Sequence, residues 1–281
     1  MKTMRWMTMT TALLAAAAAN AADTGTDPAD THAWGENVGW ASARSAHNDV
    51  TVHFYEGSGG WLSGHAWGEN IGWIVMGSAG GGPYANSASN NWGVNLSADG
   101  SLSGYAWGES VGWIRFEQTH GQPAIDPATG AFSGHAWGEN IGWLKFNGTS
   151  PDYGMRTLAF DTQPQGTPNW WLDAHGVNES YDAGDGVPAW RKYVMDTDPN
   201  VEGDYLRLTA ISNAPAKRVV AFTPASTRRY YTLRQSDDLT EAGWSNVVGQ
   251  VAVPGIGGGQ TMQDTNAAAR VFYSMEVTVA P

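Results

Sequence analysis

The sequence predicts a mainly β protein in three parts: repeated three-stranded β-units in a meander or solenoid-like array, a short helical loop segment, and an antiparallel β-sandwich. Three observations predict it. A nine-residue aromatic motif recurs four times in the first half. A stretch rich in Asp, Gly and Pro follows it. From residue 204 onward, alternating apolar runs are separated by turn-rich stretches, the pattern of a sandwich.

Residues 1–21 have the pattern of an export signal. Lys2 and Arg5 form a basic start, Trp6–Ala18 is an apolar run, and residues 19–21 fit the small-x-small rule for cleavage. The run is shorter than the about 20 residues of a membrane-spanning helix. A buried N-terminal helix is the alternative, but nothing amphipathic follows the run. We expect cleavage after residue 21 and a location outside the cell, secreted or at its surface.

The composition of residues 22–281 excludes several classes of function. These 260 residues suffice for two domains and contain no later apolar segment long enough to span a membrane. Without cysteine, the chain has no disulfide, no thiolate nucleophile and no Cys-ligated zinc. With 13 basic and 27 acidic residues, its net charge of −14 argues against nucleic acid and against anionic membranes. Calcium and neutral ligands such as polysaccharides remain open.

The first domain, residues 22–148, contains the four copies of the aromatic motif. The motif is His-Ala-Trp-Gly-Glu-Asn-Val/Ile-Gly-Trp, and its first tryptophans are 33, 40 and 30 residues apart. Turn dipeptides such as Asp99-Gly100 and Thr129-Gly130 precede the later copies, so each copy is predicted to form three strands. The first copy lacks the leading strand. The copies begin at His32, His65, Tyr105 and His135.

Side-chain alternation divides these strands into two faces. Apolar residues such as Ile114 and Phe116 lie on one face, which predicts the core, whereas the tryptophans lie on the other with His, Ser and cations. Packing of the rings on each other, with Arg or Lys over them, is favoured because most large aromatics are buried. The alternative is an exposed ladder that stacks on sugar rings or on another protein. The candidate ligand-binding residues are Trp34, Trp40, Trp67, Trp73, Trp107, Trp113, Trp137 and Trp143.

The motif also repeats a glutamate, at Glu36, Glu69, Glu109 and Glu139. We expect these carboxylates to bond turn amides, with ligand hydroxyls as the alternative. The His-x-x-x-Glu spacing suits metal binding on a helix, and Tyr105 replaces one histidine, so zinc is not expected. Paired catalytic carboxylates are not expected either, because the glutamate belongs to the repeat.

The string Ala-Trp-Gly-Glu-Asn-Ile-Gly-Trp-Leu-Lys-Phe in the fourth copy resembles the "GYAWxxNIGWINF" repeats of secreted bacterial proteins. The resemblance covers about residues 31–148. It implies an exported surface protein, without an established activity.

The connector, residues 149–203, resembles the "GTPxWWL…DGDG…TDP" segment of secreted bacterial proteins, itself similar to thrombospondin type 3 and dockerin calcium loops. The resemblance implies two short helices around a loop of carboxylates. Calcium loops carry acids at positions 1, 3 and 5 and a bidentate Glu at 12. Here Tyr181 and Ala183 fall at positions 1 and 3, and Lys192 at 12. A calcium-free linker without any cofactor is favoured, with weak calcium binding as the alternative. Its candidate ligands are Asp182, Asp185 and Asp198.

The last domain, residues 204–281, is predicted as the antiparallel sandwich. It resembles the immunoglobulin- or fibronectin-like domain that follows such connectors, for which an accessory role is implied. The predicted strands are Tyr205–Ile211, Val219–Phe222, Tyr230–Gln235, Trp244–Val253 and Arg270–Val279.

No catalytic constellation is evident in the sequence. His175 is the last histidine and the only one beyond Phe146, and neither a Gly-x-Ser-x-Gly motif nor a phosphate loop occurs. We therefore expect a non-catalytic extracellular protein that is carbohydrate-binding or adhesive, with polysaccharide or a surface protein as partner. The first alternative is a structural protein that self-associates into surface layers or fibres. The second is an enzyme that acts on polysaccharide.

Overall fold

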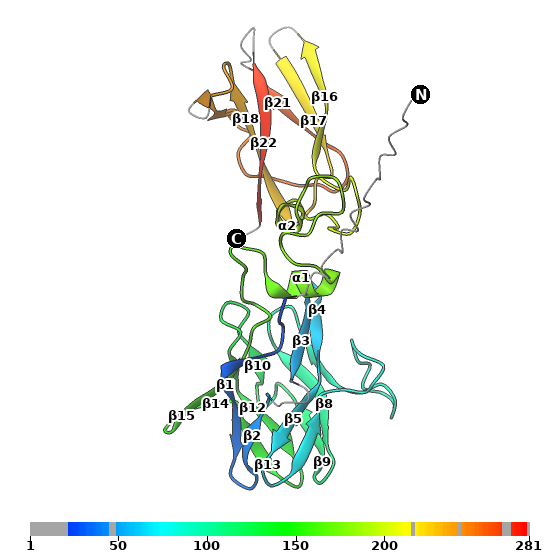
Figure 1. The fold of residues 1–281 in the computed structure, drawn as a ribbon, viewed down its shortest axis with the longest axis vertical. Coiled ribbons are helices and arrows are strands. Elements are labelled where there is room, and N and C mark those ends of the chain that lie inside the picture. Colours follow the sequence, from blue (N-terminus) through cyan, green and yellow to red (C-terminus); the bar gives the residue numbers. More distant parts are fainter. Residues whose placement is uncertain (1–21, 45–48, 215–216, 241–242, 266–270, 280–281) are drawn as a thin grey trace, which may run out of the picture.

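The computed structural model describes residues 22–279 except 45–48, 215–216, 241–242 and 266–270, so the predicted export signal lies outside the described residues. The fold is mainly β with two short helices, as predicted. Figure 1 shows a β-rich N-terminal unit at one end, the helices in the middle and the C-terminal sheets at the other end. Within the described residues, no helix has the length and apolarity needed to cross a membrane.

The four motif copies form a closed, antiparallel, eight-stranded barrel in which each copy supplies one hairpin. The hairpins follow one another around the ring in chain order, and β13 of the fourth then pairs with β1 of the first. Hairpin 1 is β1 (Thr26–Gly35) and β2 (Gly39–Ser42), hairpin 2 is β5 (His65–Gly68) and β6 (Gly72–Val75), hairpin 3 is β8 (Leu102–Gly108) and β9 (Gly112–Phe116), and hairpin 4 is β12 (His135–Gly138) and β13 (Gly142–Lys145).

The prediction of a meander or solenoid-like array is therefore wrong for this unit. Closure pairs the first copy with the fourth, Trp34 opposite Lys145, and leaves none of the eight strands at an edge. The additional strands of the copies lie outside the ring. These are β3 (Thr51–Tyr55), β4 (Gly59–Ser63) and β7 (Val94–Leu96), which extend the sheet from β8; β10 (Ala124–Ile125) with β11 (Phe132–Ser133); and β14 (Asn147–Thr149) with β15 (Asp152–Thr157), which pairs with β1.

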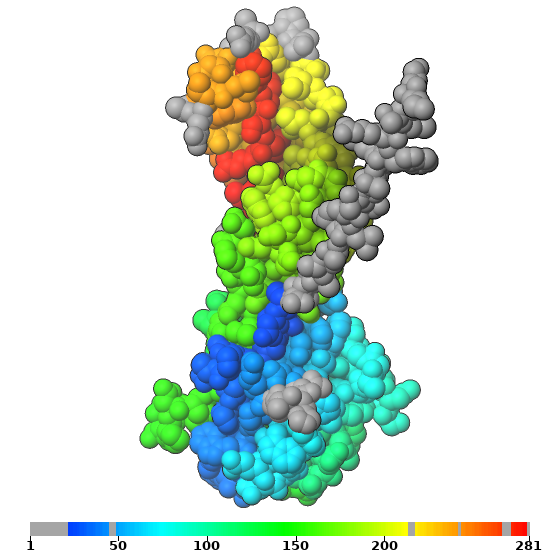
Figure 2. All heavy atoms as spheres, in the orientation of Figure 1, coloured from blue at the N-terminus to red at the C-terminus, as the bar shows by residue number. Residues whose placement is uncertain are grey.

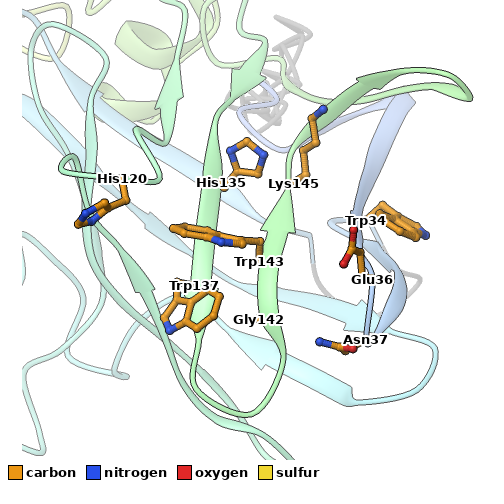
Figure 3. A pocket seen from close by; sticks show the side chains of 9 residues that line it. All are labelled: Trp34, Glu36, Asn37, His120, His135, Trp137, Gly142, Trp143 and Lys145. Atoms are coloured by element: carbon orange, nitrogen blue, oxygen red, sulfur yellow. The ribbon is translucent and has the colours of Figure 1, made fainter.

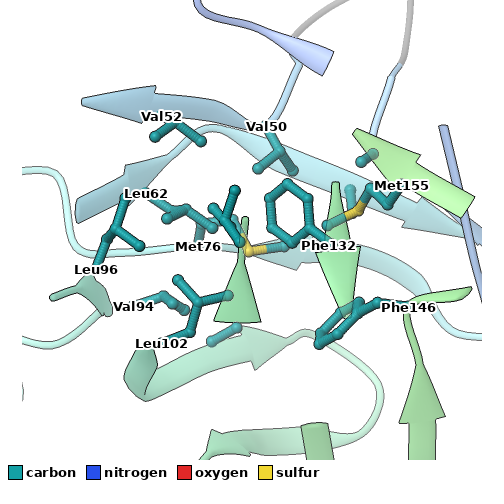
Figure 4. Packing of buried hydrophobic residues seen from close by; sticks show 14 of the residues in the cluster. Val50, Val52, Leu62, Met76, Val94, Leu96, Leu102, Phe132, Phe146 and Met155 are labelled. Carbon is teal, nitrogen blue, oxygen red and sulfur yellow. The ribbon is translucent and has the colours of Figure 1, made fainter. Parts of the chain in front are cut away.

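The barrel interior is a packed core. First strands of the hairpins contribute alanine to it, as at Ala106, and second strands mostly contribute a larger side chain, as at Ile114. Leu62, Leu102 and Phe132 are buried in the same cluster (Figure 4). The space left between the inward residues of the barrel is only about 20 Å³. The predicted division of the strands into an apolar inner face and an outer face that carries the tryptophans is confirmed.

The motif turns close one end of the barrel. In each turn a Val or Ile folds back and is buried; a side chain on Gly68, for instance, would collide with Ile71. The glycine that opens each second strand has a φ of 73° to 79°, which favours glycine. The Asn of three turns donates to a carbonyl of the preceding hairpin, whereas the third copy has Ser110 at this place. The three bonds are Asn37 Nδ2 to Ile141 O at 3.2 Å, Asn70 Nδ2 to Val38 O at 3.1 Å and Asn140 Nδ2 to Val111 O at 3.0 Å.

The helical segment packs on the opposite end of the barrel. Helix α1 (Asn169–His175) follows Pro168 and ends at Gly176 in a left-handed conformation, and α2 (Ala189–Met195) follows Pro188. Two short helices around a loop were predicted. Trp170 of α1 contacts Phe54 of β3 edge to face at 5.4 Å, so the buried core of the barrel continues into this segment.

The C-terminal residues form two antiparallel sheets around a second core cluster. The β character is as predicted, but the expected strand Trp244–Val253 is wrong, because only its two ends pair. The strand Gln260–Asp264 was not predicted. One sheet is β16 (Arg207–Ala214), β17 (Lys217–Thr223) and β21 (Gln260–Asp264); the other is β18 (Arg229–Ser236), β19 (Ser245–Asn246), β20 (Val253–Pro254) and β22 (Phe272–Val279).

A buried arginine joins the three parts of the chain. The Arg229 side chain is fully buried; it donates to the carbonyls of Val194 and Tyr193 at 2.9 and 2.8 Å and lies 3.5 Å from a carboxylate oxygen of Glu56 in the barrel unit. Arg228 beside it pairs with Asp196. These contacts hold the parts in one elongated body, from which the β14–β15 tip projects (Figure 2).

Candidate functional site

The eight predicted tryptophans all lie on the outer face of the barrel. The two tryptophans of each copy are cross-strand partners, and in hairpins 2, 3 and 4 their rings meet at 4.8 to 4.9 Å and 62° to 71°. The His or Tyr that begins the motif contacts the second tryptophan edge to face at 5.8 to 6.0 Å in every copy. Each hairpin thus carries its own aromatic stack on the outside.

These stacks remain open to solvent. Five of the rings are 36 to 45% exposed: Trp34, Trp67, Trp113, Trp137 and Trp143. The packed arrangement favoured from the sequence is therefore only partly right. Rings do contact rings within a hairpin, but among the described residues no cation lies over them; the cation–π pairs found there involve Arg191, Arg207 and Arg229.

One residue of each second strand joins neighbouring hairpins. It stands opposite the first tryptophan of the next hairpin, so the same pairing repeats four times around the ring. The pairs are Ser42 with Trp67, Val75 with Trp107, Arg115 with Trp137, and Lys145 with Trp34. We refer to Ser42, Val75, Arg115 and Lys145 as the junction residues. Two junctions are thus neutral and two are cationic.

Open grooves run along the two cationic junctions. The groove between hairpins 4 and 1 has a volume of about 590 Å³ and is lined by Trp34, Trp137, Trp143 and Lys145 among others. Figure 3 shows Trp137 and Trp143 close together, with His120 on one side of them and Lys145 on the other.

The groove between hairpins 3 and 4 is larger, about 930 Å³. It is lined by Trp107, Trp113, Trp137 and Arg115, and the segment after β6 forms its wall, where Trp92 contacts Trp113 at 5.1 Å. A smaller depression at Arg115, Trp137 and Trp143 lies between the two grooves. Because Trp137 lines all three, they form one continuous strip, which we call the aromatic strip.

No family model, curated protein or solved structure matches this chain. The resemblance of its repeats and connector to exported bacterial proteins thus stays a prediction.

The cations of the aromatic strip are free. Arg115 and Lys145 are exposed, and neither side chain has an ion pair or a hydrogen bond with another of the described residues. The other two arginines of the barrel unit are engaged: Arg44 lies 3.6 Å from a carboxylate oxygen of Asp49 and donates to a carbonyl, and Arg156 pairs with two aspartates. The cations available to a ligand on the barrel are therefore the two junction residues.

The repeated glutamates lie at the turn end of the barrel and are exposed. We expected their carboxylates to bond turn amides. Within the described part of the chain these carboxylates have no hydrogen-bond partner, so this prediction is wrong. The neighbouring asparagines connect the turns instead, through their side-chain amides.

The calcium-like loop encloses a lysine. The Lys192 side chain is fully buried, and its Nζ donates to Asp185 and to the carbonyl of Val201, both at 2.8 Å. Chiefly because of the Lys192 bond, the pKa of Asp185 falls to about 2. An Asp182 oxygen accepts three backbone amides, and Asp198 caps the amide of Asn200.

The three predicted ligands are thus engaged separately and do not form one donor set. Among the described residues, no group of three or more His, Asp or Glu side chains is placed to hold a metal ion. The ammonium group of Lys192 supplies a positive charge to the Asp185 carboxylate inside the loop.

One constellation was missed from the sequence. His53 Nε2 lies 2.8 Å from Ser63 Oγ, and His53 Nδ1 lies 3.8 Å from an oxygen of Asp173. Burial lowers the pKa of His53, which favours a neutral imidazole. The order Ser–His–Asp is that of a nucleophile with its base. However, the His–Asp distance exceeds a hydrogen bond, and the ring of His53 is stacked on Trp61 at 5.1 Å. These three residues do not line the aromatic strip.

Proposed function

We propose that this chain is a non-catalytic extracellular protein that binds carbohydrate through the outer face of its repeat barrel. The observation that carries the proposal is the exposure of paired tryptophans on the outside of a barrel whose interior is full. A cavity of about 20 Å³ is too small for a ligand, so a partner has to bind outside. Exposed indole faces beside polar groups are suited to stack on the apolar faces of sugar rings.

The export signal and the repeat resemblance support a location outside a bacterial cell, secreted or at its surface. The C-terminal sheets, which we propose to be a shortened immunoglobulin-like sandwich, then serve as an accessory spacer or attachment module. Figure 1 shows these sheets at the end of the molecule away from the motif turns. None of their described residues lines the aromatic strip.

Assembly into layers or fibres is the alternative. This alternative assumes that the edge strands of the repeats pair between molecules. Closure of the barrel removes such edges from its eight strands. The polysaccharide-active enzyme is the other alternative, and the Ser63–His53 pair is its best support. That pair does not line the aromatic strip, so it gives the exposed tryptophans no role.

The proposal is tested by depletion of the protein from solution by insoluble cellulose, chitin and xylan, and by affinity electrophoresis in soluble glucans and pectins. The double variant Trp137→Ala/Trp143→Ala is expected to lose binding at least about tenfold, as hot-spot aromatics do. Trp244→Ala, which removes a half-buried ring from the C-terminal unit, is the matched control. Equal binding by both variants, or none by the native chain to any polymer, would reject the proposal.

A further inference from the structure

We infer that the ligand of the aromatic strip is an acidic polysaccharide, a chain of sugar units that carry carboxylates. The inference rests on the proposed function and narrows it to one chemical class. It follows from the difference between the two cationic and the two neutral junctions of the ring.

The four junction residues occupy equivalent places, since each lies opposite the first tryptophan of the next hairpin. Hairpins 1 and 2 have Ser42 and Val75 there, so the fold does not require a cation at this place. Arg115 and Lys145 occur at consecutive junctions, on either side of hairpin 4. In a chain of net charge −12 these two cations have no carboxylate partner among the described residues. A ligand is the partner that the arrangement leaves for them.

The same two junctions border the grooves. Arg115 lines the groove between hairpins 3 and 4, and Lys145 lines the groove between hairpins 4 and 1. Each cation stands directly across from an exposed indole, Trp137 or Trp34. A ligand that stacks on the ring therefore places its substituents within reach of the cation. A guanidinium in this position suits a carboxylate because it donates two parallel hydrogen bonds.

Acidic side chains of the strip orient such a ligand. Glu36 and Glu139 lie in the turns, at the closed end of the barrel, whereas Arg115 and Lys145 follow the second tryptophans away from that end. Glu117 is engaged with the amides of Thr119 and His120. Apart from Glu117, which also lines the depression beside Arg115, the strip has an acidic rim at the turns and a basic rim opposite. The ligand carboxylates are expected at the basic rim, with sugar hydroxyls toward the turns.

The spacing of the stacks fits an extended sugar chain. Equivalent strands of neighbouring hairpins are two strand spacings apart, which is about 10 Å, roughly the length of two pyranose units. Hairpins 3, 4 and 1 therefore offer three consecutive platforms, with one cation at each of the two intervals between them. A polymer with at least one acidic group in each disaccharide, such as polygalacturonate, places a carboxylate at each of these intervals.

The test uses the full-length protein and affinity electrophoresis in polygalacturonate. The same polymer after carboxyl reduction supplies the sugar without the charge, and polyacrylate supplies the charge without the sugar. Native protein is expected to be retarded by polygalacturonate and not by polyacrylate, with retardation that weakens as salt rises. Arg115→Ser/Lys145→Ser is expected to lose about tenfold in affinity, because two exposed ion pairs contribute a factor of that order.

Val75→Ser is the matched control. It places serine at an equivalent junction without removing a charge, and Ser42 shows that the fold accepts serine there. It is expected to bind like the native protein. The inference is overturned, and the proposed function kept, if the charge variant binds as well as Val75→Ser or if the reduced polymer binds as tightly as polygalacturonate. Both are overturned if Trp137→Ala/Trp143→Ala binds each polymer like the native protein. Equal retardation by polyacrylate would also reject a sugar ligand.

Discussion

Ser110→Asn is expected to stabilise the barrel. Three of the four motif turns are joined to the preceding hairpin by an Asn side chain, and the third turn has serine at this place. By the symmetry of the ring, the missing acceptor is the carbonyl of Ile71. The space needed is present, because a side chain placed on Gly72 would meet nothing within 4 Å, whereas at Gly39 it would lie 3.2 Å from the amide nitrogen of Asn70.

The expected gain follows from one added neutral hydrogen bond. Such a bond contributes about 0.5–1.5 kcal/mol to the free energy of unfolding. For a unit of this size, 1 kcal/mol corresponds to about 2–4 °C in Tm. Asn140→Ser removes one of the existing links and is expected to lower Tm by a similar amount. The double variant should then lie between the two single variants, and its departure from the sum of their effects measures the coupling of the two links, because Asn140 donates to Val111, the neighbour of Ser110.

Scanning calorimetry and urea titration measure these differences between the native protein, the two single variants and the double variant. Ser110→Ala is the control, since it alters the same turn without supplying a donor and is expected to change Tm by less than about 1 °C. If Ser110→Asn left Tm unchanged while Asn140→Ser lowered it, a fourth link would not form, and the reasoning from ring symmetry would be refuted.

Three further outcomes are expected. Arg229→Ala should cost about 3–5 kcal/mol of unfolding free energy, as loss of a buried charge partner does, and should separate the calorimetric transitions of the barrel and the C-terminal sheets; a single unshifted transition would contradict this. Lys192→Met should lower stability by about 3 kcal/mol, because Asp185 loses its buried partner; an unchanged urea midpoint would contradict it. Because burial lowers the pKa of His53, its contribution to stability is complete above about pH 6.5 and is lost as the pH falls through its folded pKa. Tm measured from pH 7 to pH 5 should therefore fall less in His53→Gln than in the native protein, and equal slopes would argue against this origin.

Local sequence patterns sufficed to predict the barrel strands and their two faces. Consecutive side chains of a strand, such as Trp113 and Ile114, point to opposite faces, so the alternation can be read from neighbouring residues. Closure was not predictable in the same way. The pairing of Trp34 with Lys145 joins the ends of the repeat region, and no local pattern encodes it. A signal was present in the first copy, whose Asn37 has the same turn chemistry as the second and fourth copies although no copy precedes it. Its acceptor, Ile141, lies in the last copy.

The errors in the C-terminal half have a similar origin. The segment Gln260–Asp264 was overlooked because its exposed side chains are polar and Met262 is its one buried apolar residue. The His53–Ser63 contact was missed because it depends on the register of β3 with β4, and Asp173 reaches it only through the docking of α1.

Closure also fixes how such a sequence can change over generations. A linear array stays folded when duplication adds a unit, because each unit contacts only its neighbours. A ring of four has no free end, so losing or gaining one copy changes the circumference and exposes or strains every remaining copy at once. A change of copy number is therefore more disruptive here than in a linear array, whereas point substitution at the junction residues alters the grooves and leaves the ring intact. Each copy has one junction residue, and this residue already differs in all four copies.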